Sequence, residues 1–164
     1  MIFESRDFYI NNIENNDIEE VCEIYNSNEQ FLLNHMNVNN VTSKWMLEEI
    51  TCARKTGFKS CKIVDKASGK KIGIVDFKLG EETYVSLLMI HNNFRGKGIG
   101  KVFFINFEEY LKSLKSKSIR IDVVTDYDNS VFDFWGKNGF ISFQDVKLNW
   151  AGNILSAVTM RKYL

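Results

Sequence analysis

The sequence of 164 residues contains no proline, three cysteines and two histidines, and its formal net charge is zero. Without proline there is no proline-rich linker, and we find no internal repeat or low-complexity segment. The cysteines, Cys22, Cys52 and Cys61, form no C-x-x-C pair and have no close histidine partners. The sequence therefore indicates neither a zinc site nor a disulfide framework, and no metal is expected.

Long apolar runs are also absent. No segment approaches the roughly 20 residues needed to cross a bilayer, and the opening "MIFESRDFYI" lacks the basic start and apolar middle of a signal peptide. We therefore expect a cytoplasmic protein with no membrane partner. The zero net charge argues against nucleic acid as a partner.

The charge is unevenly distributed along the chain. Residues 1–50 carry ten acidic and two basic side chains, whereas residues 51–164 carry eleven acidic and nineteen basic ones. One interpretation is an acidic face for a cationic ligand beside a basic face for an anionic one. Solvated helix faces that happen to differ in charge would give the same counts.

The length and the 45% hydrophobic content favour one compact domain spanning residues 1–164. "DFYINNI" alternates like a strand, Asp17 and Glu20 resemble a capping box that opens a first helix, and Thr42 and Ser43 can cap a second. Three β-rich runs then predict an antiparallel meander: "FKSCKIVD", "KIGIVDFKL" and "TYVSLLMI".

The second half of the chain alternates helices and strands. Apolar residues keep a 3.6-residue period from about Gly98 to Ser116, which predicts a long helix. "SIRIDVVT" predicts a strand, and "NSVFDFWGKNGF" predicts a short helix stopped by Gly139. Two further strand candidates follow, "FISFQDVKLNW" and "NILSAVTMRKYL". Together these elements predict a mixed domain of helices and strands.

The segment "NNFRGKGIG", residues 92–100, joins the third run of the meander to the long helix. A glycine-rich turn at a helix N-terminus presents unpaired backbone N–H groups and the positive end of the helix dipole, and both attract phosphate. Arg95, Lys97 and Lys101 add positive charge. A P-loop would need Ser or Thr where Val102 stands, and the spacing of the glycines does not match a dinucleotide-binding fingerprint.

The loop resembles the pyrophosphate-binding loop of the GNAT superfamily of acetyl-CoA-dependent N-acetyltransferases. That family carries Arg/Gln-x-x-Gly-x-Gly/Ala, which is matched here by Arg95, Gly98 and Gly100. "LLMIHNNFRGKGIG" looks like the family's fourth strand, loop and third helix, and "VFDFWGKNGF" is similar to its "LYxKxGF" segment. The order of strands and helices agrees with the family over nearly the whole chain.

The resemblance implies an α/β (α+β) fold with a mixed, mostly antiparallel sheet flanked by helices and splayed between its fourth and fifth strands. It places acetyl-CoA in this split, with the pantetheine paired to the backbone of Leu88, Met89 and Ile90. The pyrophosphate would lie on the loop that comprises Arg95, Gly96, Lys97, Gly98, Ile99, Gly100 and Lys101.

The sequence departs from the family pattern at two cofactor contacts. Trp135 stands where the family commonly has a tyrosine near the sulfur, and an indole N–H can donate a hydrogen bond but cannot protonate a thiolate. It is equally well a packing residue beside the cofactor, and Tyr127 is a nearby alternative donor. The family's asparagine seven residues before that tyrosine is replaced by Asp128, so that either Asn129 or Asp128 makes the contact. We expect Asn129.

A general base is needed because only a neutral amine attacks an acyl group. Asp122 matches a strand position where some family members carry a glutamate, and it is our first candidate. Asp76, in the middle of the strand "GIVDF", is the second. His35 and His91 are predicted to be loop residues rather than catalysts.

The predicted function is transfer of the acetyl group of acetyl-CoA to a primary amine of a small molecule or protein by direct attack. The charge distribution favours a cationic acceptor, and the resemblance places the acceptor against the early helices, around Phe31 to Asn40 and Trp45. The alternative is a non-catalytic acyl-CoA-binding sensor or scaffold module. The sequence leaves the oligomeric state open, and a homodimer is compatible with it.

Overall fold

The computed structural model describes residues 1–164 and contains one eight-stranded sheet with the order β1-β2-β3-β4-β5-β6-β8-β7. Every neighbouring pair is antiparallel except β5 and β6, which are parallel. The strands are β1 (Phe3–Glu4), β2 (Phe8–Asn12), β3 (Lys59–Asp65), β4 (Lys71–Lys78), β5 (Glu82–Ile90), β6 (Ser118–Val124), β7 (Ile141–Trp150) and β8 (Asn153–Tyr163). The predicted mixed, mostly antiparallel sheet is confirmed.

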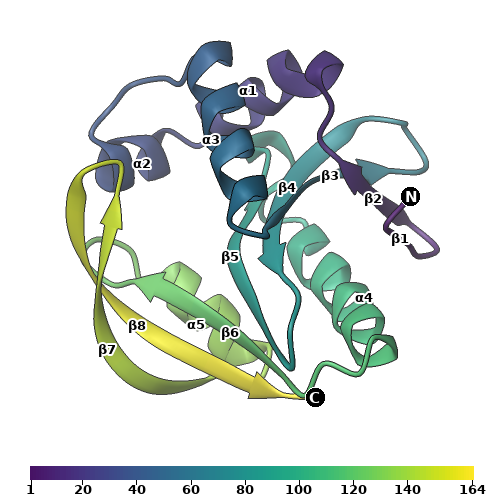
Figure 1. The fold of residues 1–164 in the computed structure, drawn as a ribbon, viewed down its shortest axis with the longest axis vertical. Coiled ribbons are helices and arrows are strands. Elements are labelled where there is room, and N and C mark those ends of the chain that lie inside the picture. Colours follow the sequence, from purple (N-terminus) through teal and green to yellow (C-terminus); the bar gives the residue numbers. More distant parts are fainter.

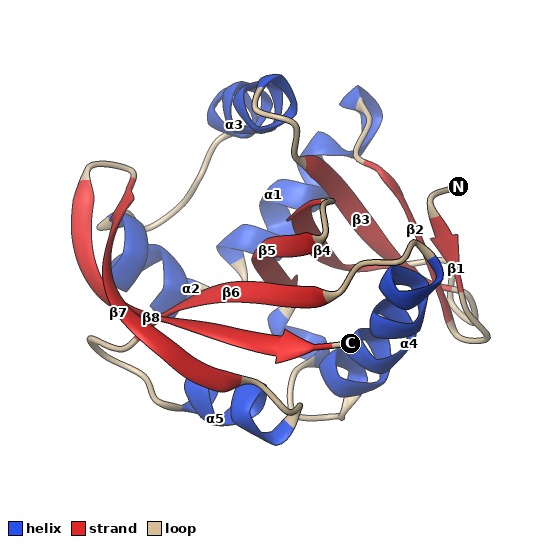
Figure 2. Ribbon diagram, turned by 60° about the horizontal axis from the view of Figure 1, so that its bottom comes forward, coloured by secondary structure: helices blue, strands red, loops and turns tan.

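Helices cover both faces of this sheet, with α1 and α3 on one face and α4 and α5 on the other (Figure 2). The α-helices are α1 (Ile18–Asn26), α2 (Glu29–Phe31), α3 (Ser43–Lys55), α4 (Ile99–Ser113) and α5 (Ser130–Lys137). A π-helical turn, Leu32–Met36, continues α2, and short 3-10 turns lie at Asn15–Asp17 and Asn92–Phe94. None of the helices is long and apolar enough to span a membrane.

Each face of the sheet has its own apolar core. Phe103, Phe107 and Leu111 of α4 are fully buried against Phe77 and its strand neighbours. On the opposite face, the apolar side chains of α1 and α3 pack on Ile74, Leu87 and Met89. Successive residues of β5 thus point into different cores, as the pleat of a strand requires.

The sheet is split between β5 and β6. These strands pair only at Glu82–Ser118, Thr83–Ile119 and Tyr84–Arg120, and beyond Tyr84 no further pairs join them. β6 continues with β8 and β7 as a separate half of the sheet (Figure 1). The sequence does not predict the short β1, so β5 and β6 are the fourth and fifth of the predicted strands. The split therefore lies where it is expected.

A β-bulge lies in β5 beside the split. Asp76 of β4 faces Leu87, whereas its neighbour Phe77 faces Val85, so that Ser86 is the extra residue. The Ser86 hydroxyl donates to the Asp76 carbonyl at 3.4 Å. A bulge bends its strand and redirects a side chain, and this one lies where two cavities of the molecule meet.

Most helix boundaries follow the predicted signals. The Thr42 hydroxyl accepts from the Trp45 N–H at 3.2 Å, and Gly139 ends α5 with a φ of 88°. The capping box predicted at Asp17 and Glu20 is wrong. The box forms one turn earlier, where the Glu14 N–H donates to Asp17, and the Asp17 carboxylate lies 2.5 Å from the Lys62 ammonium.

Candidate active site

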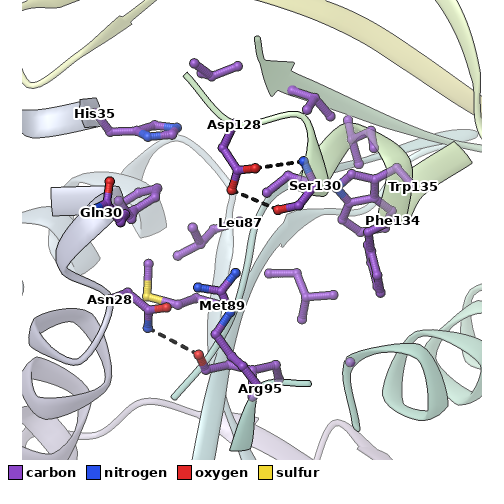
Figure 3. Close-up of a pocket in the computed structure, with 18 of the residues that line it drawn as sticks. Asn28, Gln30, His35, Leu87, Met89, Arg95, Asp128, Ser130, Phe134 and Trp135 are labelled. Atoms are coloured by element: carbon purple, nitrogen blue, oxygen red, sulfur yellow. Dashed lines mark hydrogen bonds between the residues drawn. The ribbon is translucent and has the colours of Figure 1, made fainter. Parts of the chain in front are cut away.

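A cavity of about 490 Å³ occupies the split in the sheet. Its lining comes from β5, the glycine loop and α4 on one side and from β6, α5 and β7 on the other, and the segment of α2 and its π-helical turn covers it. Figure 3 shows Asn28, Gln30 and His35 facing Phe134 and Trp135 across the cavity. The fold thus brings together the predicted glycine loop, the edge of β5 and Trp135 at one site.

The glycine loop forms one end of this cavity. Gly96 and Gly98 have φ angles of 74° and 76°, a backbone region that side chains other than glycine adopt with strain. A Cβ atom added to either residue would meet no atom within 4 Å, so that both leave open space beside their backbone. Gly98 is the N-cap of α4 and offers no capping side chain, and the helix therefore begins with unpaired N–H groups.

Positive charge surrounds these free N–H groups. Arg95 and Lys101 line the cavity, and the Arg95 side chain extends into it (Figure 3). Lys97 lies outside the lining, with its ammonium 5.8 Å from the centre of the Phe94 ring. The donor groups and the two cations fit a phosphate group of the kind that coenzyme A carries.

β5 offers an unpaired edge to the same cavity. The His91 N–H donates to Ile72 of β4, so by alternation the N–H and C=O groups of Ile90 and Leu88 point away from β4, into the split. The structure differs from the expectation at Met89, whose backbone faces β4 and whose side chain lines the cavity. The buried Asn28 amide donates to the Ile90 carbonyl at 3.2 Å, a contact that the sequence did not indicate.

Trp135 is a wall of the cavity. Its side chain is 6% exposed and packs edge-on against Phe104, Phe134 and Phe140, with ring centroids 5.0–5.1 Å apart. The indole N–H makes no hydrogen bond within the protein, although the ring lines the cavity. This geometry supports the packing interpretation of Trp135.

The loop before α5 places Asp128, and not Asn129, at the cavity. Asp128 accepts from the backbone N–H and the hydroxyl of Ser130, both at 2.8 Å (Figure 3). These bonds, with a smaller contribution from Arg95, hold the pKa of Asp128 below its usual range. Asn129 is exposed and lies outside the lining, so the expected contact from Asn129 is not supported by its position.

His35 and Tyr127 join the two sides of the cavity. The Tyr127 hydroxyl lies 2.6 Å from His35 Nδ1, and the His35 ring stacks on Phe31 at 4.2 Å. The Asn153 amide donates to the His35 carbonyl at 3.0 Å. Burial lowers the pKa of His35 to about 4, so the imidazole is neutral near pH 7 and its Nδ1 atom can accept a hydrogen bond from the Tyr127 hydroxyl. His35 is therefore part of a lid over the cavity.

Both carboxylate oxygens of Asp122, the first candidate for a general base, already have partners within the protein. Its side chain is 3% exposed, Oδ2 lies 2.9 Å from an Arg120 nitrogen, and Oδ1 accepts from the Thr159 hydroxyl at 2.6 Å. Asp122 contributes to the cavity lining, but both of its oxygens are committed to neighbouring side chains.

Comparison with known proteins agrees with this geometry. The model of the Acetyltransferase (GNAT) family matches residues 18–140, which is most of the chain. No curated protein matches the chain in sequence. The match to the family model over residues 18–140 shows that the chain belongs to the GNAT acetyltransferase family.

Solved structures share the fold at low identity. An acetyltransferase from Thermus thermophilus has a TM-score of 0.76 at 15% identity, covering 96% of this chain and 97% of its own. The PaiA N-acetyltransferase from Thermoplasma acidophilum, solved in complex with coenzyme A, has a TM-score of 0.64 at 19% identity, covering 96% and 99%. A ribosomal-protein-alanine N-acetyltransferase from Brucella melitensis has a TM-score of 0.67 at 17% identity, covering 95% and 99%.

Proposed function

We propose that the split binds acetyl-CoA and that this N-acetyltransferase transfers the acetyl group to a cationic primary amine by direct attack. The observation that carries the proposal is one cavity that joins an unpaired strand edge to a positively charged helix N-terminus. These are the two features that an extended pantetheine arm and its pyrophosphate need. The solved relative with bound coenzyme A supports the choice of this ligand.

Each part of the cavity has a task in this reaction. The N–H groups that open α4, with Arg95 and Lys101, hold the pyrophosphate. The backbone of Leu88 and the N–H of Ile90, whose carbonyl is bonded to Asn28, pair with the pantetheine amides. Trp135 and Phe134 form the apolar wall that excludes water from the thioester. The amine nitrogen attacks the thioester carbonyl, the C–N bond forms, the C–S bond breaks, and CoA leaves.

The leaving group needs little help from the protein. A thiol has a pKa of about 8.5, so that a thiolate is a fair leaving group near neutral pH. Tyr127 lines the cavity, but burial raises its pKa to about 12 and its hydroxyl is bonded to His35. We therefore assign no dedicated acid.

The test is the release of CoA from acetyl-CoA across a panel of amines, followed with a thiol reagent, beside calorimetric titration of acetyl-CoA. We expect saturable acetyl-CoA binding and turnover of at least one cationic amine. Binding without turnover on any amine would instead favour a non-catalytic acyl-CoA sensor. The absence of binding would overturn the assignment of the cavity.

A further inference from the structure

A second cavity, of about 220 Å³, lies on the face of the sheet that α1 and α3 cover. It meets the first cavity at Ser86 and Trp150, which line both. Ser86 is the extra residue of the β5 bulge, so the strand bends where the two cavities adjoin. A molecule in the second cavity would therefore reach the split beside the unpaired edge of β5.

The walls of the second cavity are aromatic. Tyr25 of α1, Trp45 of α3, Phe58 and Trp150 of β7 contribute their rings to it, and Tyr25 and Trp45 meet edge-on at 5.8 Å. Aromatic faces attract both apolar groups and cations. The volume is smaller than the roughly 300–1,000 Å³ typical of pockets for drug-sized ligands. The cavity suits a small organic molecule with a compact body.

Two carboxylates also line this cavity. Asp76 lies on β4 next to the bulge, and its Oδ1 atom is fully buried without a hydrogen-bond partner. Glu49 of α3 is exposed at the same cavity. An ionised carboxylate that is removed from water is costly unless a cation or a donor compensates it. The Ser60 hydroxyl is a donor near Asp76, but no Lys or Arg side chain lines the cavity, so the cation that would balance the carboxylate can be supplied by a ligand.

We propose that the second cavity binds the acceptor, a small primary amine with a compact apolar or aromatic body, and that Asp76 holds its ammonium and takes its proton. The proposal rests on the acetyl transfer proposed above and identifies the acceptor class and the base for that reaction. The body of the amine lies between Tyr25, Trp45 and Phe58, and its nitrogen lies at the junction near Ser86.

The proton and electron balance closes without another reactant. The ammonium gives one proton to the Asp76 carboxylate, and the freed lone pair of the nitrogen forms the C–N bond to the acetyl carbon as the C–S bond breaks. The second proton of the nitrogen passes to the CoA sulfur. Asp76 then releases its proton to water, so one acetylated amine, one CoA thiol and one proton leave.

The environment of Asp76 suits a proton acceptor near neutral pH. Burial raises the pKa of Asp76 to about 7, the Ser60 hydroxyl of β3 opposes this rise, and the charge of Glu49 adds to it. The other titratable groups facing it are Tyr25 of α1 and Cys61 of β3, whose own pKa values are raised by burial, so both are neutral. Asp122 differs, because Arg120 and Thr159 occupy its oxygens.

The experiment uses 2-phenylethylamine as the probe and has two readouts. The first is steady-state acetylation by the full chain, followed as CoA release from pH 6 to 9. The second is calorimetric binding of 2-phenylethylamine in the absence of acetyl-CoA. The variants are Asp76→Asn and Trp45→Ala. The matched control is Asp145→Asn, which removes an exposed carboxylate of β7 that lines neither cavity.

We expect Asp76→Asn to lower kcat at pH 7 by about a hundredfold or more, the usual contribution of a positioned base. The wild-type rate should level off above pH 7, whereas the rate of Asp76→Asn should keep rising toward the pKa of the amine. Trp45→Ala should raise KM about tenfold with a smaller change in kcat. Asp145→Asn should behave as wild type, and acetyl-CoA affinity should be unchanged in all three variants.

The outcomes separate this proposal from the proposed function. Acetylation by Asp76→Asn within threefold of wild type would overturn the proposal and leave the acetyltransferase intact. If no amine is acetylated, but 2-phenylethylamine binds the wild type and not Asp76→Asn or Trp45→Ala, the proposed function fails and the amine site stands. Absence of both turnover and 2-phenylethylamine binding would overturn the site as well.

Discussion

Gly98 is the residue at which the anion-binding hypothesis is easiest to test. Gly98 has a φ of 76°, and no atom lies within 4 Å of an added Cβ. Gly69, in the turn between β3 and β4, is a matched control, because it has a φ of 69° and also has no atom within 4 Å of an added Cβ. Valine at either position strains the backbone by at least about 1–2 kcal/mol. We expect Gly98→Val, and not Gly69→Val, to weaken acetyl-CoA binding at least about tenfold, or roughly 1.4 kcal/mol.

Calorimetric titration beside melting curves measures both effects. Similar losses of stability in the two variants, with loss of affinity in Gly98→Val alone, would show that the ligand lies against the loop backbone. Unchanged acetyl-CoA affinity in a folded Gly98→Val protein would contradict the phosphate site.

Trp135 is expected to act as a wall rather than as an acid. Its ring packs against three phenylalanines, and phenylalanine at this position keeps an aromatic surface. We predict that Trp135→Phe retains kcat within about tenfold, or roughly 1.4 kcal/mol of transition-state free energy. Steady-state kinetics on an accepted amine measures this. A thousandfold loss of kcat with intact acetyl-CoA affinity would assign a direct role to the indole N–H.

Asp76 should also affect the dependence of stability on pH. Its folded-state pKa is raised to about 7 from 3.8, so the folded state binds more protons than the unfolded state between these values. Asp76 therefore lowers the stability of the fold progressively as the pH rises from about 4 to 7. We expect Asp76→Asn to melt at a higher temperature than wild type at pH 8, with the difference narrowing toward pH 4. Equal melting curves at pH 8 would show that the buried carboxylate carries no such cost.

At the scale of elements, the segment of α2 and its π-helical turn closes the split. The ring of His35 contacts Phe31, Tyr127 and Trp150, and Asn153 holds its carbonyl, so the segment is attached to both α5's loop and the β7–β8 hairpin. Figure 1 shows the tip of this hairpin beside α2. The lid thus depends on contacts between distant parts of the chain.

We predict that Tyr127→Phe loosens this lid, since it removes the 2.6 Å bond to His35 Nδ1. Amide hydrogen exchange at pH 7 should rise in residues 29–38 and stay unchanged in α3. Unchanged exchange in Tyr127→Phe would show that the lid does not depend on this bond.

His35 should also affect the dependence of stability on pH. The pKa of His35 is lowered to about 4 from 6.5, so its contribution to stability is present above pH 6.5 and is lost as the pH falls toward 4. His35→Gln should remove this acidic component of the melting profile.

The elements that carry strong local patterns could be predicted from the sequence. The meander of β3, β4 and β5, the glycine loop and α4 follow from alternation, turn residues and a 3.6-residue period. The π-helical turn after α2 was not predicted, because "LLNHM" has no caps and lies in an asparagine-rich stretch that resembles a loop. The capping box expected from Asp17 and Glu20 failed because the lysines that pair with Asp17 come from β3 and β4.

The candidate site was predictable only where it is local in sequence. The loop from Arg95 to Lys101 and Trp135 could be identified by motif, but the second cavity collects Tyr25, Trp45, Phe58 and Trp150 from four separate segments. Trp45 was expected near the acceptor, whereas Asp76 ranked below Asp122. The two carboxylates differ in pairing, because Asp76 Oδ1 is buried without a partner whereas Asp122 is paired with Arg120. This difference cannot be read from the sequence of a single strand.

At the scale of the whole molecule, the glycine-loop end of the first cavity and the second cavity have opposite charge, although Asp122 and Asp128 also line the first cavity. The first ends at Arg95 and Lys101, and the second contains Asp76 and Glu49 under the acidic helices of residues 1–50. Such a division matches an anionic donor and a cationic acceptor that meet at the split. It should therefore exclude acceptors that carry a carboxylate beside their amine.

We predict that 2-phenylethylamine and phenylalanine amide are accepted, whereas phenylalanine has a kcat/KM at least about tenfold lower, equivalent to roughly 1.4 kcal/mol. Phenylalanine and its amide have the same ring and nearly the same size, so their comparison tests the carboxylate without changing the body of the acceptor. Raising the ionic strength above about 0.15 M, where the screening length is about 8 Å, should lower kcat/KM for 2-phenylethylamine at saturating acetyl-CoA. Steady-state kinetics at several salt concentrations measures both effects. Preference for phenylalanine over its amide would contradict this, because a carboxylate beside Asp76 and Glu49 would then be tolerated.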